Sequence, residues 1–410
     1  MIRFPQHAPI PFFDVRDDQL CIRGHSAAEL AERAGHTPLY VYDSAAIAAR
    51  IGELRQAVPT EFKLHFAIKA NPMPGVVNFV APLVDGLDVA SQREMQTALA
   101  SGMAAHEISF AGPGKRMPEL EAAVAAGVLL NVESPAELER LAQISRASGR
   151  RARVAIRVNP DFELKTSGMK MSGGPKPFGI DAEQVPALLA GPAMQSVDFC
   201  GFHIFAGSQN LRVEAIEEAQ TKSLQLAIQL ARHAPRPPRI LNLGGGFGIH
   251  YFPREERLDL AAIGQRMRAL VPVATRELPG CELVIELGRY IVGEAGVYLA
   301  RVLDCKKSRD QWFVVTDGGL HHHLAASGNF GQVVRKNYPV ANASRMYDGT
   351  RETVSVVGPL CTPLDILGAG VEIGRPEPGD LIAVFQSGAY GLTASPLGFL
   401  SHPEPAEILL

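Results

Sequence analysis

Eight short apolar runs alternate with helical stretches between residues 64 and 286, and this rhythm constrains the fold more than any other feature. The stretches between the runs, such as Pro118–Ala126 and Ser134–Ser148, carry Ala, Leu and Glu at helical spacing. Ser134 with Glu137 is a capping-type pair. The runs are Leu64–Ala67, Leu87–Ala90, Ile108–Ala111, Leu129–Val132, Val154–Val158, Cys200–Phe205, Ile240–Leu243 and Leu283–Glu286.

Eight strand-then-helix units of this total length are typical of a (β/α)₈ TIM barrel. A doubly wound parallel sheet would also alternate strands with helices, but its polar residues should gather at one switch point. Here polar residues follow nearly all eight runs. We therefore predict an α/β chain with a closed barrel over residues 45–290.

The rhythm changes after about residue 290. Short strands are predicted at Val297–Val302, Trp312–Thr316, Thr353–Val357 and Leu381–Phe385, separated by Gly, Pro and Asn. The first 44 residues hold short strand-like pieces and a small helix, Ser26–Ala34. We expect residues 1–44 and 291–410 to form a β-rich second domain.

Composition excludes several classes of function. The chain of 410 residues is 46% hydrophobic and 20% charged with a net charge of −3, so nothing favours nucleic acid or an anionic membrane as partner. Its five cysteines are scattered without a CxxC pair, which indicates reduced thiols rather than disulfides or zinc. No run is long enough to cross a bilayer, and the first residues lack a signal-peptide core. We expect a cytoplasmic protein.

Residues that can carry chemistry follow the predicted strands, where a barrel builds its active site. Lys69 follows the first run and precedes Asn71-Pro72, so a rigid element can hold a nucleophilic amine at a cleft. Bare backbone N–H groups in a glycine turn can surround a phosphate. The set is Lys69, Asp88 with Ser91, Arg157 with Asn159, His203 with Phe205, Gly244–Gly248, and Glu286 with Arg289.

An amine, a phosphate cradle, an aromatic side chain and a carboxylate at one mouth point to pyridoxal 5'-phosphate. Lys69 would form the Schiff base, and the glycine backbone with Arg289 would hold the phosphate. Glu286 is the candidate for keeping the pyridine nitrogen protonated, so that the ring can accept the electrons left on Cα.

Several motifs in a shared order resemble the group of diaminopimelate, ornithine and arginine decarboxylases with the alanine-racemase-like fold, over most of the chain. Those motifs are His65-Phe66-Ala67-Ile68-Lys69-Ala70-Asn71, Leu87-Asp88-Val89-Ala90-Ser91, Pro177-Phe178-Gly179-Ile180, Gly244-Gly245-Gly246-Phe247, Glu286-Leu287-Gly288-Arg289, Gly358-Pro359-Leu360-Cys361 and Gly388-Ala389-Tyr390.

The resemblance implies roles for individual residues. Cys361 would act across a head-to-tail homodimer interface, where the second domain completes the active site, and would reprotonate Cα after CO₂ leaves. His203 is a further catalytic candidate that could instead be structural. The implied cofactor-binding residues are Lys69, Asp88, Arg157, Phe205, Ser208, Gly245, Gly246, Phe247, Glu286, Gly288, Arg289 and Tyr390.

Departures from the family pattern bear on the substrate. Phe205 stands where the family has a ring-stacking histidine; a phenyl covers the same face but donates no hydrogen bond. Thr362 stands where decarboxylases of basic amino acids carry an acid that grips the distal ammonium. The loop after Leu320 lacks the Arg-Pro that helps diaminopimelate enzymes hold a distal carboxylate.

That loop instead reads His321-His322-His323. Adjacent residues on a strand alternate faces, so we predict no metal site and expect one or two histidines to face the substrate. The substrate-binding candidates are Thr362, Asp365 and His322.

The sequence thus predicts a pyridoxal-phosphate-dependent α-decarboxylase of an L-amino acid other than free ornithine, one candidate substrate being an amino acid tethered to an acyl-carrier protein. A diaminopimelate decarboxylase making L-lysine is the alternative. A racemase is a different class on the same barrel, but those racemases place an arginine at the pyridine nitrogen where this chain has Glu286. A non-enzymatic carrier of pyridoxal phosphate would leave the second domain unexplained.

Overall fold

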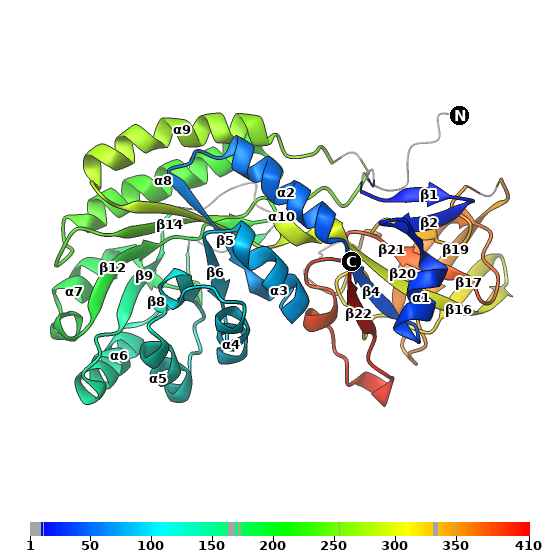
Figure 1. The fold of residues 1–410 in the computed structure, drawn as a ribbon, viewed down its shortest axis with the longest axis horizontal. Coiled ribbons are helices and arrows are strands. Elements are labelled where there is room, and N and C mark those ends of the chain that lie inside the picture. Colours follow the sequence, from blue (N-terminus) through cyan, green and yellow to red (C-terminus); the bar gives the residue numbers. More distant parts are fainter. Residues whose placement is uncertain are drawn as a thin grey trace. The chain divides into compact units, whose positions relative to one another are not determined.

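The chain folds into two compact units in a computed structural model that describes residues 10, 12–162, 169–170, 174–253, 255–330, 335–347 and 349–410 (Figure 1). The barrel unit comprises residues 48–249 and 258–290. The second unit comprises residues 1–47, 250–257 and 291–410. The sequence pattern did not predict that residues 250–257 belong to the second unit.

Eight parallel strands close the barrel. Their order is β9-β12-β14-β15-β5-β6-β7-β8, and β8 pairs with β9 to complete the ring. All eight predicted runs overlap one of these strands, so the predicted (β/α)₈ barrel is confirmed. The strands are β5 (Phe62–Ala67), β6 (Gly86–Val89), β7 (Ile108–Phe110), β8 (Leu129–Val132), β9 (Arg153–Asn159), β12 (Asp198–His203), β14 (Ile240–Gly245) and β15 (Glu282–Leu287).

Helices surround these strands (Figure 1). Side-chain oxygens cap several helix starts: the Ser134 hydroxyl accepts from the Glu137 N–H at 3.1 Å, and Asp259 accepts from the Ala262 N–H at 3.0 Å. The helices are α2 (Ser44–Ala57), α3 (Pro74–Val80), α4 (Gln92–Ala100), α5 (Met117–Ala126), α6 (Pro135–Ser148), α7 (Val185–Ala190), α8 (Val213–Ala231), α9 (Leu260–Glu277) and α10 (Arg289–Val292). None of the described helices combines the length and apolarity needed to cross a lipid bilayer.

The second unit is built on a sheet with the order β18-β21-β16-β17-β19-β20. The four strands predicted after residue 290 correspond to β16, β17, β19 and β21. The sheet comprises β16 (Gly296–Ser308), β17 (Gln311–Thr316), β18 (Val340–Asn342), β19 (Arg351–Val357), β20 (Ile366–Gly374) and β21 (Leu381–Val384).

Both ends of the chain contribute to this unit. Strand β4 (Leu39–Tyr42) pairs with β16 on one side and with β22 (Ala406–Leu409) on the other, which brings blue and red segments together in Figure 1. The smaller elements are β1 (Asp14–Arg16), β2 (Gln19–Ile22), β3 (His25–Ser26) and α1 (Ala27–Ala34). The unit's core includes Leu30, Val41, Val297, Leu381 and Phe385.

We expect the Ser134→Ala substitution to lower the free energy of unfolding by about 1 kcal/mol, because it leaves the Glu137 N–H without its cap. Urea denaturation followed by circular dichroism measures the effect. Ser148→Ala, at the other end of α6, is the matched control. Its exposed hydroxyl bonds only local backbone, so its change should stay within about 0.5 kcal/mol. Equal effects of the two substitutions would contradict the capping role.

Candidate active site

Lys69 lies in a 3₁₀ turn, Ile68–Ala70, that directly follows β5. Its side chain is exposed whereas both neighbours are buried, so the neighbours anchor the turn and the Lys69 side chain stays accessible. A Cβ added to Gly288 would lie 3.0 Å from the Cβ of Ala70 and 3.1 Å from the carbonyl of Ala67. Glycine at 288 therefore lets the Lys69 turn approach the end of β15 closely.

Each barrel strand contributes a buried polar side chain to the site region. Hydrogen bonds join four of these side chains around Asp88 and three around Glu286, whereas Arg157 forms a separate group with Glu133, which directly follows β8. The set is His65, Asp88, Ser109, Asn131, Arg157, His203, Asn242 and Glu286.

The first group is centred on Asp88. Its Oδ1 lies 3.2 Å from Nδ1 of His65 and also accepts from the Ser109 hydroxyl, to which Asn131 donates at 3.4 Å. Burial alone would lower the pKa of His65, but the Asp88 carboxylate reverses this and raises it. The Oδ2 atom of Asp88 is buried and has no partner among the described residues.

The second group joins Arg157 to Glu133 by a buried ion pair of 2.7 Å. Glu133 also accepts from the backbone N–H groups of Gly112 at 2.6 Å and Gly179 at 3.2 Å. Burial would raise the pKa of Glu133, but the Arg157 guanidinium lowers it below its usual value. Phe178 lies with its ring centre 5.2 Å from that guanidinium. Sequence reasoning missed Glu133, although it stands directly after the run Leu129–Val132.

The third group is centred on Glu286. Its Oε2 lies 3.1 Å from Nε2 of His203 and 3.0 Å from Nδ2 of Asn242. Burial would raise the pKa of Glu286, but His203 above all, with Lys69 and Arg157, holds it far below its usual range. Glu286 is therefore ionised at neutral pH. Asn242, inside the run Ile240–Leu243, was missed because an amide in a buried strand has no local signature.

The glycine turn after β14 packs directly on neighbouring backbone. Gly244 and Gly246 have φ of +68° and +76°, and a Cβ on Gly246 would lie 2.2 Å from the carbonyl oxygen of Gly207. Asn210 N–H donates to the Gly246 carbonyl at 2.8 Å, so the turn and the loop after β12 run side by side. The buried Ser208 hydroxyl in that loop has no partner among the described residues. An anion such as phosphate fits this arrangement.

Aromatic side chains flank the turn. Phe205 is half-buried, and a Cβ on Gly244 would lie 2.9 Å from its ring. Phe247 is buried and meets Tyr290 edge-on, with ring centres 5.8 Å apart. Phe205 thus lies against the turn where the resemblance places the ring-covering side chain.

The remaining predicted site residues belong to the second unit. Cys361 is exposed and Thr362 is partly exposed. Asp365 is buried, and its two oxygens accept from the backbone N–H groups of Leu320 at 2.6 Å and Leu360 at 2.8 Å. These bonds account for both oxygens, so the geometry gives no support to the predicted substrate contact of Asp365.

The three adjacent histidines are buried in the same unit. His322 uses both ring nitrogens locally: Nδ1 lies 3.3 Å from the Tyr298 hydroxyl and Nε2 lies 2.9 Å from the Pro403 carbonyl. Its predicted substrate contact is therefore also without geometric support. Burial lowers the pKa of His322 to about 4, so the ring is neutral. In the described part of the chain, no three His, Cys, Asp or Glu side chains are arranged to hold a metal.

Tyr390 also belongs to the second unit and has a left-handed backbone, with φ of +54°. Its ring centre lies 6.3 Å from that of Phe330. The predicted residues Lys69, Asp88, Arg157, His203, Phe205, Ser208, Gly245, Gly246, Phe247, Glu286, Gly288 and Arg289 all belong to the barrel unit.

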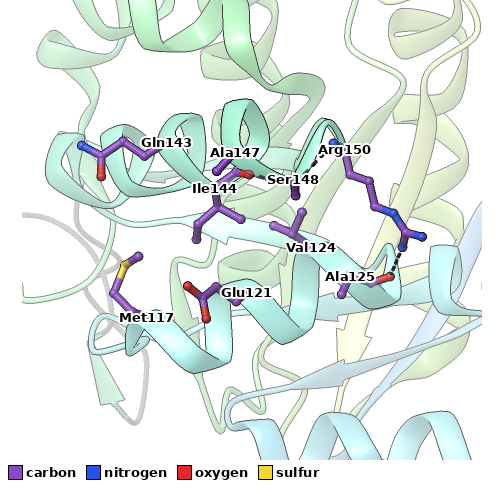
Figure 2. A pocket seen from close by; sticks show the side chains of 9 residues that line it. All are labelled: Met117, Glu121, Val124, Ala125, Gln143, Ile144, Ala147, Ser148 and Arg150. Carbon is purple, nitrogen blue, oxygen red and sulfur yellow. Dashed lines mark hydrogen bonds between the residues drawn. The ribbon is translucent and has the colours of Figure 1, made fainter.

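A separate hollow of about 490 Å³ lies between α5 and α6 on the barrel unit (Figure 2). Apolar side chains such as Met117, Val124 and Ile144 line it, and Arg150 borders it with a hydrogen bond of 2.8 Å to the Ala125 carbonyl. None of the predicted site residues lines this hollow.

Residues 44–293 match the family model for the pyridoxal binding domain of pyridoxal-dependent decarboxylases. The chain belongs to this family. It is 38% identical over 379 residues to an L-glutamyl-[BtrI acyl-carrier protein] decarboxylase of Niallia circulans, covering 91% of this chain and 88% of that protein. It is 32% identical to a diaminopimelate decarboxylase of Aquifex aeolicus, with 98% and 92% covered.

A solved structure supports this family assignment. Diaminopimelate decarboxylase from M. jannaschii, in complex with L-lysine, superimposes with a TM-score of 0.86 at 27% identity, covering 98% of this chain and 93% of that one. The predicted fold, the cofactor pyridoxal 5'-phosphate and the decarboxylase class are therefore confirmed. The orphaned Ser208 hydroxyl, the glycine turn and the ionised Glu286 fit that cofactor.

The lowered pKa of Glu133 gives a testable pH dependence. Its carboxylate adds stability that is fully present above the usual glutamate pKa of about 4.5 and is lost as pH falls through the lower folded value. We expect Glu133→Gln to be clearly less stable than wild type at pH 7, with the gap narrowing below about pH 4.5.

Urea midpoints measured from pH 7 to pH 3 test this expectation. Glu139→Gln is the matched control because Glu139 is exposed on α6, and it should change little at any pH. A stability gap for Glu133→Gln that stays constant across the range would contradict the assigned ion pair.

Proposed function

We propose that this pyridoxal-dependent decarboxylase acts on an L-amino acid whose distal end carries no free charge, such as an amino acid joined through its side-chain carboxyl to an acyl-carrier protein. The observation that carries the proposal is the lack of charged groups where the family grips that end. Thr362 follows Cys361 in place of an acid, and residues 320–327 contain no Arg or Lys.

Pyridoxal phosphate, when bound, supplies the electron sink for the pair left on Cα as CO₂ departs. Lys69 would hold the cofactor covalently at the end of β5. The Ser208 hydroxyl, backbone N–H groups of the glycine turn and Arg289 would bind the phosphate. The ionised Glu286 would hold the proton on the pyridine nitrogen, and Phe205 would cover one ring face.

The proton that replaces CO₂ needs a donor. In this proposal the exposed Cys361 thiol gives its proton to Cα across a head-to-tail homodimer, with Tyr390 reaching the phosphate, and the thiolate is reprotonated from solvent. The bond between Cα and the carboxylate breaks, CO₂ leaves, and a C–H bond forms in its place. We also place the enzyme in the cytoplasm, where its five free cysteines would stay reduced.

The substrate follows from charge balance at the distal end. A buried ammonium or carboxylate without an oppositely charged partner is strongly disfavoured. Threonine at 362 can hydrogen-bond an amide or thioester linkage but cannot neutralise an ammonium. In the segment after Leu320, Ala325 and Ala326 are buried and offer no cation for a carboxylate. The Niallia circulans relative, which by its name acts on a carrier-bound glutamyl group, supports this choice.

Free meso-diaminopimelate is the second candidate, favoured by the Aquifex aeolicus relative and by the M. jannaschii structure. It requires the enzyme to hold a distal ammonium and carboxylate with other groups. The two candidates differ in one measurable respect, since only one of them needs the carrier protein.

We expect purified enzyme loaded with pyridoxal phosphate to release CO₂ from a glutamyl-carrier protein at least about tenfold faster than from free glutamate, ornithine or diaminopimelate. A tenfold ratio corresponds to about 1.4 kcal/mol of discrimination. Radiolabelled CO₂ release and mass spectrometry of the carrier measure the rates. Conversion of meso-diaminopimelate to lysine at a comparable rate would overturn the substrate assignment.

Lys69→Ala separates the cofactor role from the substrate question. We expect borohydride reduction to attach the pyridoxyl group to Lys69 in wild type and to no residue of the site in the variant, with turnover reduced by several orders of magnitude. Lys306→Ala, exposed on β16 in the second unit, is the control and should behave as wild type. Labelling at another lysine would refute the assignment of Lys69.

A further inference from the structure

Among the described residues, Glu286 has hydrogen-bond partners for one of its two oxygens. Oε2 lies within hydrogen-bond distance of both His203 Nε2, at 3.1 Å, and Asn242 Nδ2, at 3.0 Å. Oε1 bonds no described residue, yet it is not among the fully buried unpartnered atoms, so it keeps accessible surface. The carboxylate therefore has one clamped oxygen and one open oxygen.

We propose that His203 and Asn242 are positioning residues that clamp Oε2 of Glu286 and thereby direct Oε1 toward the pyridine nitrogen of the cofactor. This inference rests on the proposed function, in which Glu286 holds the ring proton. It assigns His203 an indirect role through Glu286, in place of a direct role in proton transfer.

Strand pairing sets the positions of the three residues. His203 and Asn242 are register partners on β12 and β14. Strand β14 pairs in turn with β15, where a register shift after Asn242 brings Gly245 opposite Glu286. Two donors on adjacent strands thus converge on a carboxylate from the next strand, and no loop takes part in placing them.

The orientation of the Asn242 amide is fixed independently of Glu286. Its Oδ1 accepts from the Gly244 backbone N–H at 2.8 Å, so Nδ2 must face the carboxylate. The same side chain therefore ties Glu286 to the first residue of the glycine turn. A shift of that turn would move the clamp as well.

Burial makes the clamp costly to remove. His203 and Asn242 are 1% and 6% exposed, and a buried carboxylate needs hydrogen-bond donors to remain ionised. Nδ1 of His203 is also buried and has no partner among the described residues. In the described part of the chain, the bond from Nε2 to Glu286 is thus the one polar contact that places the His203 ring.

The test removes the His203 or Asn242 donor and follows the protonation of the pyridine nitrogen of the cofactor. We expect His203→Leu to lower kcat roughly 10- to 100-fold, the usual cost of losing a residue that orients a direct ligand. With cofactor labelled with ¹⁵N in the ring, the protonated-ring NMR signal should be lost at a lower pH than in wild type. Asn242→Leu should act in the same direction.

Two further variants distinguish a positioning role of His203 from a general loss of structure. His203→Gln keeps an N–H donor and should recover much of kcat and of the NMR profile. Gln220→Leu, a control in α8, removes a buried amide that has no partner in the described chain and should leave both unchanged. If His203 acts through Glu286, His203→Leu should cost little more in a Glu286→Gln background than Glu286→Gln costs alone.

Unchanged ring titration in His203→Leu, or full additivity with Glu286→Gln, would overturn the inference while leaving the decarboxylase assignment intact. Failure of the proposed function has a different signature, because wild type itself would then show no protonated ring signal and no CO₂ release. Circular dichroism and the cofactor dissociation constant confirm that each variant is folded and loaded.

Discussion

An ionised carboxylate buried at the end of a barrel strand is the constraint on which this site depends. Desolvation disfavours the charge on Glu286. Hydrogen bonds from His203 and Asn242 to one oxygen, and the positive charges of Lys69 and Arg157, stabilise it. In the proposed function Glu286 holds a proton on the pyridine ring, which a neutral carboxylic acid could not do. That function therefore requires these neighbours to outweigh the cost of burial.

The same requirement recurs around the barrel. Asp88 has His65 and Ser109, and Glu133 has Arg157 and two backbone N–H groups. Each carboxylate is paired with a group from a neighbouring strand or loop, so charge compensation and strand order depend on each other. This explains why polar residues occupy positions in strands that otherwise consist of apolar side chains.

The barrel could be predicted from the sequence because its signal is local. Each run of apolar residues marks its own strand. Ser134, together with Glu137 three residues later, marks the start of α6. The hydrogen-bonded pairs were harder to predict than the residues themselves, because the partners are distant in sequence: 83 residues separate His203 from Glu286, and 44 separate Asn242 from it. Strand β20 also escaped prediction, since its glycines, including Gly370 at φ +59°, weaken the strand pattern.

Asp365 joins two loops of the second unit, because its oxygens hold the backbone of Leu320 and of Leu360 together. Gly319 and Gly358 leave room for this carboxylate, since a Cβ on Gly319 would lie 2.2 Å from one of its oxygens and a Cβ on Gly358 would lie 2.4 Å from the other. The loop that contains His321–His323 and the loop that contains Cys361 are consequently held together by this carboxylate. Replacing either loop alone would therefore disturb the other, because the Asp365 carboxylate would lose one of its two backbone donors.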